Sequence, residues 1–484
     1  MESIWFRSCP IEHKEALAQN IKADIAVIGA GMTGILTAYK LQKTGKSVVV
    51  LEANRIANGQ TGKTTAKITS QHGLLYYRMI LDLGEEKARQ YAQANEKAIE
   101  AYRSLIQEEK IDCDFETVDA YVYSQNAEIL EKEALSAQKL GISASFVPTP
   151  RFPVATAGAV KFQNQAQFHP LKLIAPLAQK LTIYENTVVQ SVDGHRIETN
   201  RGTVWGQKII FACHYPFINF PGMYFSKMHQ ERSYILALEN ANPIDGMWIG
   251  ADAHSYSLRR WRDTLLFGGE SHRTGKNRQG GRYHALRQKA QELFPGSRVT
   301  AAWSAQDCMT PDHIPYIGSY SSSIGSYSSS RPDWLIATGF QKWGMTTAMA
   351  AAQILCDRLC SKENPYADLF RPDRFSAKSI PGMAEEGKQA FQGLGKRFFQ
   401  IPENTVETIP AGHGGIVWQN GKKTGVLKDK SGKTFSVSPR CPHMGCQLEW
   451  NPDEQSWDCP CHGSRFDLQG NLLEGPAQTG LPHS

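Results

Sequence analysis

The sequence lacks any apolar run that approaches the roughly 18 residues needed to cross a membrane. Residues 1–5 have neither the basic start nor the apolar core of a secretory signal. No basic patch with interleaved aromatic residues, which would favour nucleic-acid binding, is present. These absences predict a cytoplasmic protein with no membrane span and no nucleic-acid partner.

Metal-binding spacing is also missing from most of the ten cysteines. Those without such spacing are spread over the first three quarters of the chain: Cys9, Cys113, Cys213, Cys308, Cys356 and Cys360. The others all lie between residues 441 and 461. Metal chemistry that uses cysteine is therefore expected near the C-terminal end.

Two short motifs in this region each pair a cysteine with a histidine. Cys441-x-His443 is separated by fifteen residues from Cys459-x-x-His462. Two thiolates and two imidazoles in this order are what a Rieske [2Fe–2S] centre requires, with the cysteines on one iron and the histidines on the other. A structural zinc site with two cysteines and two histidines is the alternative, but it leaves the two other cysteines of the region unexplained.

Both motifs resemble those of Rieske proteins of the cytochrome bc type. The resemblance implies a disulfide between Cys446 and Cys461 that links the two ligand loops, and Gly475-Pro476-Ala477 resembles the family's proline loop over the cluster. High-potential members have a tyrosine two residues after the serine of the second motif, where this chain has Phe466 after Ser464. Since one hydrogen bond to a ligand sulfur is lost, we expect a reduction potential below that of the respiratory proteins.

A nucleotide-binding pattern lies near the N-terminus. Residues 24–28 form a buried-strand run, followed by Gly29-x-Gly31-x-x-Gly34 and by a second strand that ends at Glu52. The glycines let backbone amides and a helix N-terminus approach a pyrophosphate, and the acid can accept a hydrogen bond from a ribose hydroxyl. This spacing predicts a dinucleotide site; a tight strand–helix turn without a ligand is the alternative.

Three further segments resemble the flavoprotein family of D-amino-acid, glycine and sarcosine oxidases. They are residues 52–65, residues 303–318 and the glycine-rich turn at residues 337–346, which precedes an alanine-rich helix from Thr347 to about Cys360. The resemblance implies FAD, held against the last turn, where a helix dipole can stabilise the reduced flavin. It assigns these residues to the cofactor: Gly29, Gly31, Gly34, Glu52, Arg55, Thr61, Gly62, Thr64, Thr65, Gly339, Gly344, Met345 and Thr346. No second glycine triplet follows a later strand, which argues against a separate NAD domain.

The substrate side of this resemblance depends on one position. In amino-acid-oxidising members an arginine five residues before the Pro-Asp aspartate binds the substrate carboxylate, whereas this chain has Asp307 five residues before Asp312. A carboxylate there repels a carboxylate and attracts an ammonium, so Asp307 is the catalytic candidate; a turn residue that faces water is the alternative. Ala305 stands where some sarcosine oxidases have the cysteine that binds flavin covalently, so we expect non-covalent FAD.

The expected fold class is α/β (α+β), with a Rossmann-like FAD-binding domain, an interleaved substrate domain and a small all-β Rieske domain. We expect the flavoprotein unit at residues 1–370, a linker rich in proline and glycine at 371–400, and the Rieske domain at 401–484. The substrate domain would come from two excursions, residues 65–173 and 216–299. The chain from Ile401 has seven basic and nine acidic residues, whereas the rest is net positive; opposite signs favour docking, although solvated surfaces explain them equally well.

Together these features predict an FAD-dependent oxidoreductase. It would oxidise an amine or amino acid at the flavin and pass the electrons through a [2Fe–2S] cluster to an acceptor whose class the sequence leaves open. The alternative is a non-catalytic redox sensor or electron-transfer module. A Rieske oxygenase would need two histidines and a carboxylate at a mononuclear iron, and no clear motif of this kind is present. The overall plan resembles a bacterial group of these flavoproteins that carry a C-terminal Rieske domain.

Overall fold

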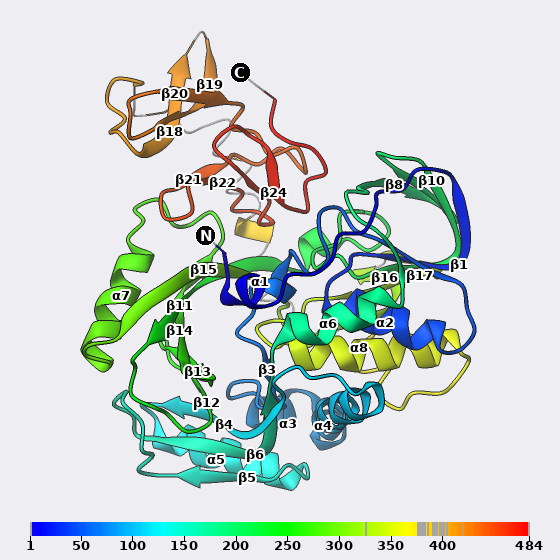
Figure 1. Ribbon diagram of the computed structural model, residues 1–484, viewed down its shortest axis with the longest axis vertical. Helices are drawn as coiled ribbons and strands as arrows, with labels where there is room; N and C mark the ends of the chain where they lie inside the picture. The colour runs from blue at the N-terminus through cyan, green and yellow to red at the C-terminus, as the bar shows by residue number, and fades with distance from the viewer. Residues whose placement is uncertain are drawn as a thin grey trace.

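The structure is a computed structural model that describes residues 2–324, 327–374, 405–419 and 421–482, and also residues 384, 387–389, 395 and 402. Most of the predicted linker at 371–400 lies outside the described residues. Two large sheets with their helices form the body of the molecule, and two small sheets stand on one side of it (Figure 1).

The first large sheet holds the predicted βαβ unit. Within the described residues it has eight strands, with β16, β17, β10, β1, β2 and β7 in this order, β9 attached to β10, and β8 attached to β9. The neighbours from β17 to β7 are parallel, as buried strands such as the apolar β2 favour. The bounds are β1 Ile21–Ile28, β2 Val48–Leu51, β7 Thr182–Tyr184, β8 Val189–Asp193, β9 Arg196–Thr199, β10 Thr203–Phe211, β16 Tyr316–Ile324 and β17 Tyr327–Thr338.

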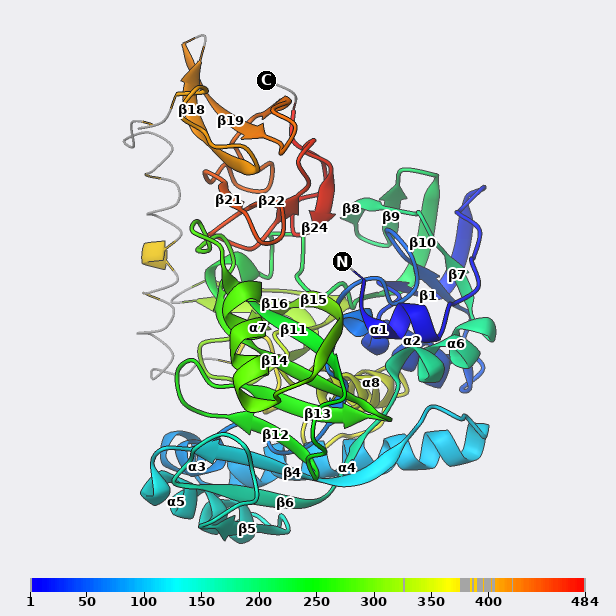
Figure 2. The same cartoon turned by 60° about the vertical axis from the view of Figure 1, so that its left-hand side comes forward.

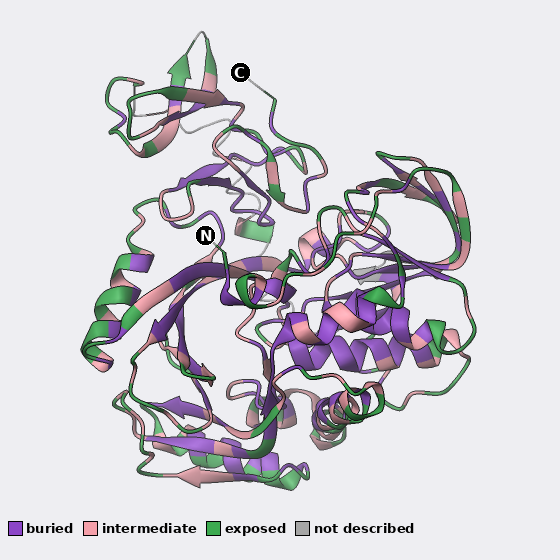
Figure 3. Ribbon diagram, viewed as in Figure 1, coloured by how far each residue is buried: buried purple, intermediate pink, exposed green. Residues whose placement is uncertain are grey.

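Helices cover this sheet, and two of them pack on each other. α2 (Met32–Gln42) and α8 (Gly344–Leu359) are buried along most of their length (Figure 3). Gly34 lies in α2 where an added Cβ would be 1.9 Å from the carbonyl oxygen of Gly29, so only glycine allows the helix to start this close to β1. The remaining helices are α1 Ile4–Ser8, α3 Tyr76–Leu83, α4 Glu85–Glu109, α5 Ala127–Lys139, α6 Pro170–Gln179 and α7 Arg282–Leu293, with short 3₁₀ turns η1 Gln60–Gly62 and η2 Tyr224–Ser226.

The second large sheet is mostly antiparallel and forms the wall opposite the βαβ unit. In the described part of the chain it has nine strands in the order β15, β11, β14, β13, β12, β4, β6 and β3, with β5 beside β6. The bounds are β3 Lys67–Ile68, β4 Glu116–Ser124, β5 Ala144–Val147, β6 Gly158–Gln167, β11 His229–Glu239, β12 Met247–Gly250, β13 Ser257–Trp261, β14 Thr264–Arg273 and β15 Arg298–Met309. It draws on both expected excursions, but β15 runs on to Met309, ten residues beyond the expected end at Val299.

The C-terminal part is small and all-β among its described residues. One sheet contains β18 His413–Gln419, β19 Lys422–Lys428 and β20 Thr434–Val437, and the other contains β21 Glu449–Asn451, β22 Ser456–Asp458, β23 Arg465–Phe466 and β24 Leu472–Glu474. The second of these sheets lies next to the body, near β11 and β15, while β18 to β20 lie farther away (Figure 2). None of the described helices is long and apolar enough to cross a membrane.

Candidate functional site

A cavity of about 1130 Å³ lies between the two large sheets. Its wall on the βαβ side comes from the ends of β1, β2 and β10 and from residues 337–345. Its opposite wall comes from β11, β14 and β15, which contribute Tyr234, Gly269 and Asp307 among others. The predicted nucleotide and substrate residues therefore meet around one space.

Most of the residues predicted to contact FAD line this cavity. They are Gly29, Gly31, Glu52, Thr61, Thr64, Thr65, Gly339, Gly344 and Met345. Gly31, Met32 and Thr33 present the start of α2, and the amide of Met32 donates to the Thr61 hydroxyl at 2.8 Å. A helix N-terminus with a glycine before it suits a pyrophosphate. The groups at this end of the cavity thus fit the dinucleotide they were predicted to bind.

Glu52 closes the fingerprint at the end of β2. Its two carboxylate oxygens accept from the amides of Ala30 at 2.8 Å and Asn54 at 2.9 Å. Burial raises the pKa of Glu52, although the hydrogen bonds from these two amides act in the opposite direction. The carboxylate lines the cavity with its position fixed by the backbone, as a group that accepts from a ribose hydroxyl would require.

Four predicted cofactor residues do not line the cavity. Gly34 instead allows α2 to pack on the Gly29 carbonyl, and Gly62 packs where an added Cβ would be 2.1 Å from the Phe6 ring. The Thr346 hydroxyl exchanges hydrogen bonds with the backbone of Thr69. Arg55 pairs with the buried Glu185 at 3.0 Å. These residues shape the site from behind, and the sequence pattern alone does not separate such a role from direct contact.

Several lining residues were not predicted. Gln60, Lys63, Lys67 and His72 lie within or just after the small-residue loop. The Lys67 ammonium donates at 2.6 Å to the carbonyl of Trp248 and to a serine hydroxyl. Burial, helped by a nearby arginine, lowers the pKa of Lys67 to about 7. Their closeness in sequence to the predicted threonines could have indicated that they line the cavity. Lysine in a loop, however, is usually exposed to solvent, so its presence alone does not predict a site residue.

Asp307 lines the cavity from β15, directly opposite Glu231 on β11. Burial raises the pKa of Asp307 to about 7; Glu231 adds to this shift, while Lys342 opposes it. The Lys342 ammonium also lines the cavity and donates to the hydroxyl of Ser271 at 2.8 Å. The alternative in which Asp307 caps a water-facing turn does not fit a half-buried position in a strand on the cavity wall.

The four predicted cluster ligands come together from two loops. The Nδ1 atoms of His443 and His462 are 3.2 Å apart. The thiol of Cys441 hydrogen-bonds with the thiol of Cys459, which lowers the pKa of Cys441 and raises that of Cys459; the hydroxyl of Ser464 also bonds Cys441. All four ligand side chains are at least half-buried, and they converge as a pair of thiols and a pair of imidazoles. This donor set fits a Rieske [2Fe–2S] cluster.

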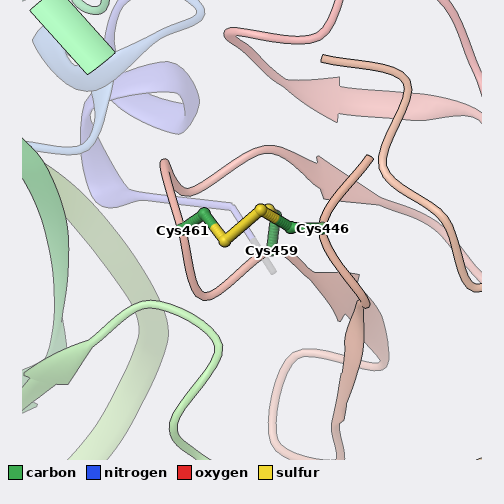
Figure 4. Close-up of side chains that lie close together, drawn as sticks. All are labelled: Cys446, Cys459 and Cys461. Carbon is green, nitrogen blue, oxygen red and sulfur yellow. A yellow bond between two sulfur atoms is a disulfide. The ribbon is translucent and has the colours of Figure 1, made fainter. Parts of the chain in front are cut away.

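The second cysteine pair forms a disulfide in the structure. Cys446 and Cys461 are bonded, with their Cα atoms 6.6 Å apart, and Cys459 lies beside them (Figure 4). The sulfur atoms of these three cysteines lie within 4.8 Å of one another. Since two of the three are already bonded to each other, we do not interpret this group as a separate metal site. The disulfide links the two ligand loops.

The second ligand loop lies against the body of the molecule. Four consecutive carbonyls, from residues 460 to 463, accept hydrogen bonds from side chains of β11, β14 and β15. Arg273 donates to Pro460 at 3.2 Å and to Cys461 at 3.4 Å. Gln230 donates to His462 at 2.6 Å, and Gln306 donates to Gly463 at 2.9 Å. Residues 472–480, which include the predicted proline loop, line the large cavity itself.

A buried ion-pair network joins the same two parts. Arg232 on β11, only 1% exposed, contacts Glu454 at 3.0 Å and Glu474 at 3.1 Å. Both carboxylates also pair with Arg465, and Lys63 reaches Glu474 at 2.5 Å. Although burial alone would raise it, Arg232 and Arg465 hold the pKa of Glu454 at about 2. In these contacts the flavoprotein part contributes the cations Arg232 and Lys63, and the Rieske part contributes the carboxylates of Glu454 and Glu474.

These features define a flavoprotein with an attached Rieske iron–sulfur domain, and the comparisons agree. Residues 24–358 match the family model of FAD dependent oxidoreductases (DAO), and residues 402–483 match that of the Rieske [2Fe-2S] domain. The chain is 37% identical to the Rieske 2Fe-2S iron-sulfur protein YhfW of Bacillus subtilis (strain 168), over 98% of this chain and 96% of that one.

Solved structures share the fold of the larger part at low identity. L-proline dehydrogenase from P. horikoshii matches with a TM-score of 0.61 and 18% identity, over 74% of this chain and 98% of its own. Glycine oxidase from Geobacillus kaustophilus matches with a TM-score of 0.60 and 17% identity, over 73% and 99%. The chain belongs to the DAO family of FAD-dependent oxidoreductases and has a C-terminal Rieske domain; its cofactors are FAD and a [2Fe–2S] cluster.

Proposed function

We propose that this protein oxidises a small amine or amino acid at FAD and passes the electrons through its Rieske cluster to an acceptor. FAD supplies a two-electron hydride acceptor, and the cluster supplies a one-electron carrier. The observation that carries the proposal is the shared cavity, which is lined by Gly29 and Gly31 of the glycine fingerprint, by Asp307 and by residues 472–480 of the Rieske part. Flavin and substrate would therefore share one space, and the Rieske part that carries the cluster borders this space through residues 472–480.

For the cluster, we propose Cys441 and Cys459 as ligands of one iron, and His443 and His462 as ligands of the other. The hydrogen-bonded thiols and the facing Nδ1 atoms, 3.2 Å apart, support this division. The disulfide between Cys446 and Cys461 would hold the two ligand loops together. For FAD, we propose the nine lining residues identified above, with Glu52 accepting from the ribose.

For the substrate, we propose that Asp307 binds the ammonium of an amine. Its carboxyl lines the cavity and lies opposite a second carboxylate, that of Glu231. A carboxyl with a pKa of about 7 can also take the proton that an ammonium must release before its carbon is oxidised. Low exposure to water would strengthen this ion pair relative to one on the surface.

An α-amino acid is the second candidate substrate, and Lys342 is the observation that favours it. The Lys342 ammonium lines the same cavity and could bind a substrate carboxylate. It already contacts the Ser271 hydroxyl at 2.8 Å and lies 3.9 Å from Glu231. Because these partners would compete with the ligand, an amine without a carboxylate is the better fit.

An anaerobic screen tests the proposal. Amines, polyamines and amino acids are mixed with the protein while flavin absorbance and the cluster EPR signal are followed. We expect amines to bleach the flavin faster than their α-carboxylated analogues, and the cluster signal to appear in the same sample. If no amine or amino acid reduces the flavin, the non-catalytic redox module becomes the better account.

Asp307→Asn tests the substrate contact. A partly buried ion pair contributes a few kcal/mol, so kcat/KM for amines should fall on the order of a hundredfold without loss of FAD or iron. Asp263→Asn is the control, because this carboxylate is fully exposed in the turn between β13 and β14. If the protein oxidises a simple amino acid best and Asp307→Asn behaves like wild type, Asp307 is a structural residue and the amine assignment is wrong.

A further inference from the structure

One side chain of the flavoprotein part contacts a proposed cluster ligand directly. The Oδ1 atom of Asn219 lies 2.9 Å from Nε2 of His443. Because Nδ1 of His443 faces Nδ1 of His462, it is the atom on the cluster side of the ring. An imidazole that binds iron through Nδ1 carries its proton on Nε2, so Nε2 donates and the Asn219 carbonyl oxygen accepts.

Asn219 is well placed to keep this contact. It lies in residues 212–228, which connect β10 to β11, and its carbonyl oxygen accepts from the amide of Met223 at 2.8 Å. The preceding carbonyl, that of Ile218, accepts from the hydroxyl of the buried Tyr320. The same connection lines the flavin cavity through Tyr215 and other residues. The segment that contacts the ligand is therefore continuous with the wall of the flavin site.

The surroundings of the second histidine are different. The rings of Tyr215 and Phe225 lie 6.4 Å and 6.2 Å from the ring of His462. Gln230 of the flavoprotein part donates to the main-chain carbonyl of His462 at 2.6 Å. The flavoprotein part thus contacts the imidazole of His443 through Asn219 and the main chain of His462 through Gln230.

We propose that Asn219 is a positioning residue through which the flavoprotein part orients His443 and lowers the reduction potential of the cluster. A carbonyl that accepts from Nε2–H increases electron donation by the imidazole to its iron, and this stabilises the oxidised cluster. Removing a hydrogen-bond partner of a metal ligand typically lowers metal affinity or activity by about ten- to a hundredfold. The inference deepens the proposed function, since it rests on His443 as an iron ligand.

Two substitutions with opposite expected signs test the proposal. Asn219→Leu removes the acceptor, so the reduction potential of the cluster should rise. We expect the ratio of oxidised to reduced cluster at a fixed potential to fall by up to about tenfold, which is about 59 mV for one electron. Asn219→Asp offers a stronger, negatively charged acceptor, so the potential should fall. Both are measured in the full-length protein by equilibrium titration with mediators, following the EPR signal of the reduced cluster.

Asn277→Leu is the matched control on the same interface. The Asn277 amide donates across it to Asn451 at 3.1 Å and to Asp453 at 2.8 Å, and neither partner is a proposed ligand. Its potential should stay at the wild-type value. Pulsed EPR should show a changed remote-nitrogen coupling for one histidine in Asn219→Leu and no change in the control.

Three outcomes would overturn the proposal: unchanged potentials in both Asn219 variants, shifts of the same sign in both, or an equal shift in Asn277→Leu. If Asn219→Leu loses its iron, the nearly isosteric Asn219→Asp decides alone, and a potential that does not fall contradicts the proposal. The titration needs no amine and no flavin turnover. A failure of amine oxidation therefore leaves this test intact, whereas loss of the Rieske EPR signal in wild type would contradict the ligand assignment itself.

Discussion

Replacing Arg232 with methionine should weaken the contact between the flavoprotein and Rieske parts. The Arg232 guanidinium is 1% exposed and pairs with Glu454 and Glu474, which belong to the other part. It also donates to Gln306 at 3.0 Å and to Ser304 on its own side. Methionine keeps much of the volume but removes the charge, so the two carboxylates lose a buried partner.

The expected loss of docking free energy follows from the partners that the two carboxylates keep. Removing one member of a buried ion pair typically costs about 3–5 kcal/mol, because the other charge stays buried and uncompensated. Here Arg465 still pairs with both carboxylates, and Lys63 still pairs with Glu474. We therefore expect the lower value, about 3 kcal/mol, which is roughly a hundredfold in the docking equilibrium.

Amide hydrogen exchange measures this equilibrium at the interface. The amides of Gly281 and Arg282 donate to the carboxylate of Asp453 across it, at 3.1 Å and 3.0 Å. If these amides exchange only after the Rieske part has undocked, they should exchange up to about a hundredfold faster in Arg232→Met than in wild type. Arg278→Met is the matched control: its guanidinium pairs with Glu449 across the same interface but is 50% exposed, so an effect of about 0–1 kcal/mol is expected.

Equal exchange rates in wild type, Arg232→Met and Arg278→Met would refute this reasoning. So would a larger effect of Arg278→Met than of Arg232→Met, because burial is the property that is expected to separate them. FAD and iron content should stay at wild-type levels in both variants, which distinguishes undocking from general unfolding.

Three further predictions concern the cofactors and the substrate. Burial raises the pKa of Asp307 from 3.8 to about 7, so the carboxylate forms as pH rises through 7. We therefore expect kcat/KM for cationic amines to rise between about pH 6 and 8. If kcat/KM of Asp307→Asn rises over the same pH range, the assignment of Asp307 is wrong. Gly31→Val should abolish FAD binding, because the new side chain would lie against the Thr61 hydroxyl and occupy the space in front of the α2 N-terminus that the pyrophosphate needs. FAD retained after gel filtration would show that the fingerprint is misplaced. Changing Cys446 and Cys461 to serine should accelerate cluster loss while FAD stays bound, since the disulfide closes a loop of 15 residues and a closure of that length contributes about 3 kcal/mol. Two free thiols at these positions, found by alkylation and mass spectrometry of non-reduced wild type, would refute the bond.

The elements that sequence analysis located well have strong local patterns. The apolar run and glycine triplet give β1, α2 and β2 at their expected positions, because backbone sterics and burial act over a few residues. The helix expected from Thr347 to about Cys360 is found as α8, with Gly344 at its start. The two Cys–His motifs likewise indicate the ligand loops, because each motif contains its own ligands at fixed spacing.

The residues that form contacts between the flavoprotein and Rieske parts show no such pattern in the sequence. Lys63 and Glu474 are 411 residues apart in the chain, and Asn219 and His443 are 224 residues apart. Single polar side chains in loops have no periodicity, so the sequence does not indicate which of them meet. Arg55 lies inside a predicted cofactor loop and pairs with the buried Glu185, a contact that the loop sequence does not indicate.

We propose that electrons from the substrate enter at FAD and reach the Rieske cluster of the same chain. The most direct test is anaerobic rapid mixing with an amine that bleaches the flavin, followed by freezing at set times and EPR of the cluster. We expect the reduced-cluster signal to grow as flavin reduction proceeds, at dilutions where chains do not meet. Full flavin reduction with a cluster that stays oxidised throughout, although dithionite reduces it, would show that the cluster does not take electrons from FAD.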